Sequence, residues 1–317
     1  MRASFNHGVA VGGYPPVATE PMSTLNHAVA FEKYHGTGND FIIVDATDPI
    51  ANRSAFATAH CDRTTGVGSE TDAATGADGV LFLDLEDRFS PPRIIMTLVQ
   101  PDGSVAPICG NGARCAAVWA MDRTTAESVM IDTQVGTRRA TRVDDGIAVE
   151  MGAPTFDPQR VPLAADRTSP LIEEAVEGLT VTAVDAGLPQ AVAFVDDIEA
   201  VDVESVAPAV RHADAFPAGT NVTVAEQVEP RREGVPRFCQ RSYERGVEGE
   251  TDSCATGSVA IAAAANRIGL IESTTPVDIS LAGGDLQISE TDRGELLLTG
   301  GVTHEFDGDV PATVADD

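Results

Sequence analysis

Apolar positions along the chain form short runs and alternations that are typical of strands, separated by turns and by a few helical stretches. From residue 29 the pattern predicts strands at 29–36, 41–46, 79–85, 92–104, 128–136, 138–146 and 147–154. Residues 52–66 predict a helix that ends at a glycine-rich turn, and the alanine-rich run after Cys109 predicts a second helix.

A second series with the same order starts near residue 151. It predicts strands within 179–197, 220–228, 236–246 and 277–310, and helices at 202–216 and after Cys254. Both series run strands, helix, strands, cysteine-led helix, strands. This repeat predicts an α+β fold of two similar units, each a mostly antiparallel sheet or partial barrel around its cysteine-led helix.

The two cysteine-led helices begin in closely similar sequences. Cys109 stands in DGSVAPICGNGARCAAVWAM, and Cys254 stands in EGETDSCATGSVAIAAAANR, 145 residues later (254 − 109). The first turn of a helix carries free N–H groups and the positive end of the helix dipole, so it can bind a carboxylate. Because the same field stabilises a thiolate, we expect thiolate character at both cysteines.

Two such cysteines suit the inversion of an amino-acid α-carbon. One thiolate takes the α-proton from one face, and the other thiol returns a proton to the opposite face. Helix N–H groups around the α-carboxylate stabilise the carbanion, so the scheme needs no metal and no cofactor. The other cysteines, Cys61, Cys115 and Cys239, are expected to be ordinary core residues.

The charge of the chain indicates its surroundings. Asp and Glu number 49 against 21 Lys and Arg, the net charge is −28, and the single lysine is Lys33. Such a surface repels nucleic acid and anionic membranes. We expect a cytoplasmic protein from a cell with concentrated internal salt, which screens the repulsion. The five cysteines lack CxxC spacing, and the histidines do not cluster at ligand spacing, so neither a disulfide framework nor a metal site is expected.

Four stretches resemble the diaminopimelate epimerase family of two-cysteine, cofactor-independent enzymes: FEKYHGTGNDFIIVDA, ICGNGARCAA, SYERGVEGETDSC and THEFDG. The resemblance covers nearly all of residues 29–310. It implies interconversion of LL- and meso-diaminopimelate, a small amino-acid substrate, on the route to lysine. It also implies two pseudo-symmetric domains with the active site in the cleft, residues 29–150 with 303–317 and residues 151–302, and it is compatible with a homodimer. Residues 1–28 lack a consistent period and predict a disordered leader, within which Met22 is a second plausible start.

The resemblance also implies the roles of individual residues. Cys109 and Cys254 become the acid/base thiols, and Arg245 can hold a carboxylate in a fork. The implied substrate-binding residues are Asn39, Gln100, Gly110, Asn111, Gln190, Asn221, Glu244, Arg245, Ala255 and Thr256. Among them, the first-turn residues Gly110, Asn111, Ala255 and Thr256 form the backbone cradle for the α-carboxylate.

Some positions depart from the family pattern. Gln100 stands where the family usually has Asn, and GLPQ replaces GNPH, so that Leu188 replaces an amide and Gln190 an imidazole. Ala255 replaces a glycine, and extra residues separate GVG from ADG. These departures leave open an epimerase or racemase of another amino acid with an altered distal pocket, or a non-catalytic paralogue. A thiol redox protein is a further alternative.

Overall fold

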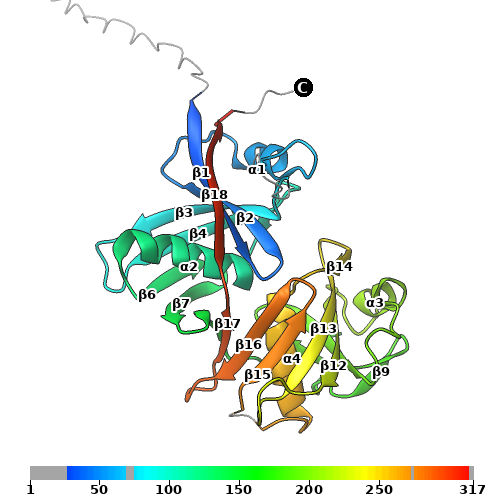
Figure 1. Cartoon of the computed structure of the whole chain (residues 1–317). Coiled ribbons are helices and arrows are strands. Elements are labelled where there is room, and N and C mark those ends of the chain that lie inside the picture. Colours follow the sequence, from blue (N-terminus) through cyan, green and yellow to red (C-terminus); the bar gives the residue numbers. More distant parts are fainter. Residues whose placement is uncertain (1–26, 69–74, 273–274, 314–317) are drawn as a thin grey trace, which may run out of the picture.

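The computed structural model describes residues 27–68, 75–272 and 275–313 of the chain. The first series of elements runs through the N-terminal part (Figure 1). It comprises β1 (Ala28–Gly36), β2 (Asn39–Asp45), α1 (Arg53–Cys61), β3 (Gly79–Glu86), β4 (Arg93–Val99), β5 (Val105–Ala106), α2 (Gly110–Thr124), β6 (Ser128–Thr133), β7 (Gly136–Val143) and β8 (Gly146–Gly152).

The second series occupies most of the remaining chain. It comprises β9 (Glu174–Val176), β10 (Leu179–Asp185), β11 (Pro189–Val195), α3 (Val203–Arg211), β12 (Asn221–Val228), β13 (Arg237–Glu244), β14 (Gly249–Thr251), α4 (Ala255–Arg267), β15 (Val277–Leu281), β16 (Gly284–Glu290), β17 (Leu296–Gly300) and β18 (Thr303–Pro311). The helices of the described part are too short or too polar to span a bilayer.

The strand pairings repeat between the two series. In the first, β2 pairs parallel to β3, β3 antiparallel to β4, and β4 parallel to β6, with α1 and α2 as the crossovers. In the second, β11 pairs parallel to β12, β12 antiparallel to β13, and β13 parallel to β15, with α3 and α4 as the crossovers. Antiparallel strands complete each unit, so the expected α+β fold with a duplicated unit is confirmed.

Each sheet buries both faces because consecutive residues of its strands point to opposite sides. In β2, Phe41 and Ile43 join the cluster around α2, whereas Ile42 and Val44 join the cluster around α1. This explains why the central strands are continuously apolar in sequence. The cysteine-led helices α2 and α4 therefore lie on the inner side of their sheets, and α1 and α3 cover the outer sides (Figure 1).

Two strand pairings connect the C-terminal strands β17 and β18 to the N-terminal unit. β17 pairs antiparallel to β8, which joins the two sheets, and β18 pairs antiparallel to β1 along nearly its whole length (Figure 1). One buried cluster accordingly contains residues of both α2 and α4. We propose the domain boundaries given by the resemblance, 29–150 with 303–317 and 151–302, on these pairings.

The predicted elements differ from the observed ones mainly at short strands and helix ends. β5, β9 and β14 were not predicted, because two or three residues show no measurable period. The helix expected at 52–66 ends at Cys61, since Asp62 instead accepts hydrogen bonds from Thr64 and Thr65 in a turn. Most of the expected leader, residues 1–26, lies outside the described residues, while β1 already begins at Ala28.

The seam between the two units gives a stability prediction. Leu298 of β17 is fully buried against the shared cluster, and a Cβ built on Gly110 would lie 2.8 Å from its Cδ2. We expect Leu298→Ala to lower the free energy of unfolding by about 2–5 kcal/mol, because it leaves a cavity at this seam. Leu297→Ala, one residue along on the less buried face, should cost less than about 1 kcal/mol. Urea unfolding of both variants at one fixed salt concentration measures the difference, and equal losses would contradict a core at the seam.

Candidate active site

A cavity of about 560 Å³ opens where the N-termini of α2 and α4 approach each other. Both cysteines of the repeated motif line it, with residues from β2, β13 and the loops that follow β4 and β14. The predicted site residues among its lining are Asn39, Gln100, Cys109, Gly110, Asn221, Glu244, Arg245, Cys254, Ala255 and Thr256. The fold therefore gathers these ten predicted residues around one space.

The two helix ends meet almost in contact. A Cβ built on Gly110 would lie 3.0 Å from the Cβ of Ala255 and 2.8 Å from Leu298 Cδ2, so the glycine at position 110 permits this close approach. Cys109 is the N-cap of α2, and its Sγ accepts a hydrogen bond from the Gly112 N–H at 3.5 Å. Cys254 is the N-cap of α4. The free N–H groups of both first turns are therefore available to one small anion.

Burial raises the pKa of both thiols. It raises the pKa of Cys109, although hydrogen bonds from the backbone of Gly112 and Asn111 act in the opposite direction. Burial also raises the pKa of Cys254 well above its usual range, and the nearby Glu244 carboxylate adds to the increase. The loss of solvation therefore acts against the expected thiolate character, whereas the N–H groups of the helix end act in its favour.

Charged groups from β13 and the loop after it form the opposite wall. Glu244 accepts a hydrogen bond from the Thr251 hydroxyl at 2.6 Å, and burial raises the pKa of its carboxyl group. Asn221 orients Arg245, the residue after Glu244, because the Asn221 Oδ1 accepts the Arg245 backbone N–H at 2.8 Å. The Arg245 guanidinium donates to the carbonyls of Ala218 and Gly219, and it forms no ion pair within the described residues. It can therefore bind a carboxylate of a ligand.

Asn111 lies beneath the cavity rather than in its lining. It is fully buried, and its Nδ2 donates to Asn39 Oδ1 at 2.7 Å and to Ser253 Oγ at 2.8 Å. Asn39 in turn donates to Asp78 at 2.9 Å. The Asn111 side chain thus connects the N-terminal unit to the residue that precedes Cys254.

Gln190 also lies beneath the cavity. Its fully buried side chain donates to Thr256 Oγ1 at 3.0 Å and approaches Cys254 Sγ at 3.7 Å. Leu188, two residues before Gln190, does line the cavity. Gln100 stands at the far wall, where its Oε1 accepts the Ser104 hydroxyl at 3.1 Å.

The sequence analysis missed a charged group on the cavity wall. Arg63 lines the cavity and pairs with Asp78 and with both oxygens of Asp40. Asp40 also pairs at 2.6 Å with Lys33, the single lysine, which is completely buried. The acids are 38 residues apart in sequence, and the parallel pairing of β2 with β3 brings them together, so no local signal marks the group.

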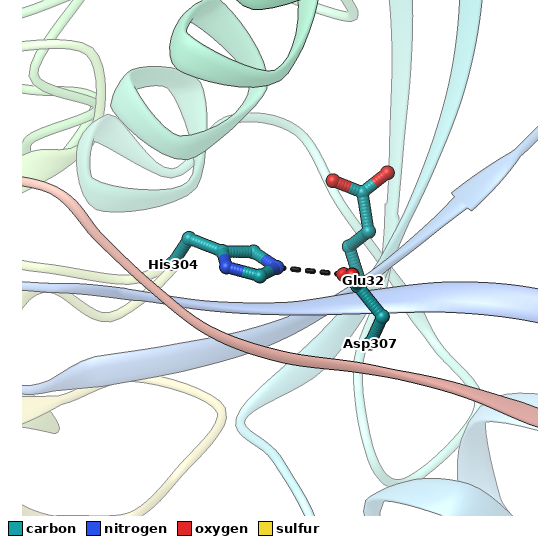
Figure 2. A group of neighbouring side chains, drawn as sticks. All are labelled: Glu32, His304 and Asp307. Carbon is teal, nitrogen blue, oxygen red and sulfur yellow. Dashed lines mark hydrogen bonds and ion pairs between the residues drawn. The ribbon is translucent and has the colours of Figure 1, made fainter.

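A second cluster of polar side chains has the composition of a metal site. Glu32 of β1 lies close to His304 and Asp307 of β18, outside the lining of the cavity (Figure 2). His304 hydrogen-bonds to Asp307 at 2.7 Å, and Glu32 is occupied by the Trp119 indole, the Tyr34 hydroxyl and the Arg123 guanidinium. Because these donors already satisfy Glu32, the geometry favours a structural cluster over a cation site.

Comparison with known proteins places these features in one family. The family model for diaminopimelate epimerase matches residues 31–156 and 182–305. A diaminopimelate epimerase of Methanocella arvoryzae is 41% identical over 271 residues, which cover 82% of this chain and 89% of the relative. One of Archaeoglobus fulgidus is 35% identical, over 88% of this chain and 95% of the relative.

Solved structures with low sequence identity share the fold. A phenazine biosynthesis protein of the PhzF family from Bacillus anthracis has a TM-score of 0.61 at 13% identity, over 90% of this chain and 99% of that one. A hydroxyproline epimerase from Agrobacterium vitis has a TM-score of 0.58 at 15% identity, over 89% and 91%. With the family model and the relatives above, the conclusion is that this chain belongs to the diaminopimelate epimerase family.

Proposed function

We propose that this protein is a diaminopimelate epimerase, an isomerase that interconverts the LL and meso isomers in lysine biosynthesis. The observation that carries the proposal is the meeting of two cysteine-capped helix ends at one cavity. Relatives named diaminopimelate epimerase, matched over most of both chains, support the substrate.

The geometry supports a two-thiol mechanism with Cys109 and Cys254 as the catalytic residues. A substrate held between them would present one face of its α-carbon to each sulfur. The thiolate on one side takes the α-proton, and the thiol on the other side donates its proton to the planar carbanion, so no net proton is consumed. The two cysteines then exchange protonation states, which makes the reaction reversible by the same route.

The helix ends and the opposite wall have separate roles in this mechanism. Free N–H groups at Gly110, Asn111, Ala255 and Thr256 hold the α-carboxylate and stabilise the charge that develops next to it. Asn39, Gln100, Asn221, Glu244 and Arg245 would bind the remainder of the substrate. Glu244 hydrogen-bonds to Cys254, so it is suited to accept the proton that one thiol must lose before the first turnover.

A second candidate function is the epimerisation of a different amino acid at the same thiols. Leu188 favours it, because this apolar side chain lines the cavity at a position where the family usually has an amide. Arg245, which forms no ion pair within the described residues, favours diaminopimelate, whose distal end carries a carboxylate.

Replacement of either catalytic cysteine tests the mechanism. We expect Cys109→Ala and Cys254→Ala each to lower kcat for LL-diaminopimelate by at least about 10²-fold, because each removes one proton-transfer group. Cys239→Ala, which removes a thiol of β13 outside the cavity lining, should keep its activity. Activity is followed in D₂O as α-deuteration together with the isomer ratio, in salt and reductant.

The outcomes separate the candidates. Robust turnover in both alanine variants would contradict the two-thiol mechanism. Wild-type enzyme that deuterates another amino acid, and leaves diaminopimelate untouched, would support the second candidate. Absence of deuterium at any α-carbon tested would indicate a non-catalytic paralogue.

We also propose that the enzyme works in a salt-rich cytoplasm and forms a homodimer, the latter on family resemblance. The support for the first is the net charge of −28 together with a single lysine, which the fold buries. Self-repulsion of such a surface opposes folding unless salt screens it.

Salt should therefore stabilise this protein. We expect Tm to rise between roughly 0.1 M and about 1 M KCl, as the Debye length falls from ~10 Å to ~3 Å. Sorbitol of equal osmolality serves as the control for solvent exclusion, and it should raise Tm less. A Tm that is insensitive to KCl, or equal in the two solutes, would count against adaptation to salt.

A further inference from the structure

The duplicated fold allows the two thiols to be compared position by position. In the first unit Ile43 pairs with Leu81, and Leu81 with Leu98. In the second unit Val192 pairs with Thr223, and Thr223 with Ser242. The strand registers give four equivalent pairs: Phe41 and Gln190, Leu81 and Thr223, Met96 and Gln240, and Leu98 and Ser242. The helices give a fifth pair, Ala113 and Ser258, because the N–H groups of these residues bond to the carbonyls of Cys109 and Cys254.

The glycines in the two helices confirm that these sets occupy equivalent space. A Cβ on Gly112 would meet Leu81 at 3.3 Å and Phe41 at 3.5 Å. A Cβ on Gly257 would meet Gln240 at 2.7 Å, Thr223 at 2.8 Å and Ser242 at 3.1 Å. Five apolar residues below the first cysteine are thus replaced by five polar residues below the second.

The five polar residues, which we term the α4 network, are Gln190, Thr223, Gln240, Ser242 and Ser258, and all are buried. Each of their side chains is hydrogen-bonded within the network or to residues 254 and 256. Apolar residues fill the same space in the first unit, so packing alone does not require polar groups here. A fully satisfied buried network fixes the orientation of its members.

The hydrogen bonds have one consistent direction. The Thr223 hydroxyl donates to Gln190 Oε1 at 3.0 Å, so Ser242 must donate to Thr223 at 2.9 Å. Gln190 Nε2 is then fixed toward Thr256 Oγ1, at 3.0 Å, and Cys254 Sγ, at 3.7 Å. Because Thr256 accepts this N–H, its own proton remains available for Cys254 Sγ at 3.6 Å.

A second branch holds the backbone of the same cysteine. Gln240 Nε2 donates to Ser242 Oγ at 3.0 Å and to the Cys254 carbonyl at 2.9 Å, while its Oε1 accepts the Ser258 hydroxyl at 2.6 Å. Cys109 lacks both branches among the described residues. Its carbonyl accepts only the Ala113 N–H, at 2.8 Å. Its sulfur is bonded by backbone N–H groups of the first turn, including that of Gly112, and by no side chain within the described residues.

We propose that the α4 network is a positioning device for Cys254, which directs two side-chain donors, Gln190 and Thr256, at its sulfur and makes the two thiols chemically unequal. The inference rests on the proposed function for its role in turnover. Donors on the sulfur favour the thiolate and offset part of the effect of burial and of Glu244. Gln190 cannot exchange a proton as an imidazole can, so its role is to orient and not to transfer.

Site-resolved alkylation tests the proposal without any substrate. Iodoacetamide reacts with the thiolate, so the pH at which each cysteine reacts at half its maximal rate reports its ionisation. We expect Gln190→Leu to move this midpoint for Cys254 upward by about one pH unit and to leave Cys109 in place. Thr223→Val, which removes the donor to Gln190 Oε1 and the acceptor of the Ser242 hydroxyl but leaves Gln190 in place, should move it in the same direction by less.

The ionisable groups that share the cavity with Cys254 must be kept constant in this test. The Glu244 carboxylate acts on Cys254 directly. The other ionisable side chains of the cavity lining are Arg63, Asp78, Cys109, Arg245, Glu250 and Asp252. None of them is changed by the two variants. Thr182→Val is the matched control, because Thr182 is equally buried in the second unit but bonds to the Glu173 N–H, outside the network.

The results distinguish this proposal from the proposed function. An upward shift confined to Cys254, with a parallel shift in the acidic limb of the kcat/KM profile, supports the positioning role. Unchanged midpoints in both folded variants, or equal shifts at both cysteines, would overturn it. If the variants shift the Cys254 midpoint as expected but the wild-type protein does not turn over diaminopimelate, the proposed function is rejected and the positioning role of the network stands.

Discussion

The close approach of two helix ends is the constraint on which this structure depends. α2 and α4 begin within contact distance, with Gly110 against Ala255, and each begins at a cysteine. Two separate sheets must hold these helices so that their free N–H groups face one cavity. The β8–β17 pairing and the shared apolar cluster meet that requirement, because they join the two units directly below the helix ends.

The wall of the cavity is held by ion pairs that extend from a buried lysine toward the surface. Lys33, Asp40, Arg63 and Asp78 form a continuous set of ion pairs, and Asp78 positions the Asn39 amide. Lys33, the single lysine of the chain, is completely buried with two partners at 2.6 Å, so dissolved salt screens these contacts less than it screens surface ion pairs.

Duplication provides the two cysteines with the same backbone and with different surroundings. The helix ends, the cysteine at the N-cap and one first-turn glycine, Gly112 or Gly257, are common to both units. The side chains below them are apolar in one unit and hydrogen-bonded in the other. The two sulfurs therefore share a backbone geometry but differ in the side chains packed beneath them.

Much of this protein could be read from the sequence. Periodicity gave nearly all the helices and longer strands, and the two cysteine motifs with glycine or alanine after them identified the helix ends that form the cavity, because these signals are local. Short strands such as β5 and β9 escaped, since two or three residues carry no period.

Only the tertiary structure decided how the gathered residues are used. It placed Asn111 and Gln190 beneath the cavity and added Arg63 to its wall, because these positions follow from pairings between distant strands. It also showed the burial that acts against the expected thiolate character of the cysteines. The helix-end field is visible in a sequence motif, whereas the desolvation that outweighs it depends on everything packed around the sulfur.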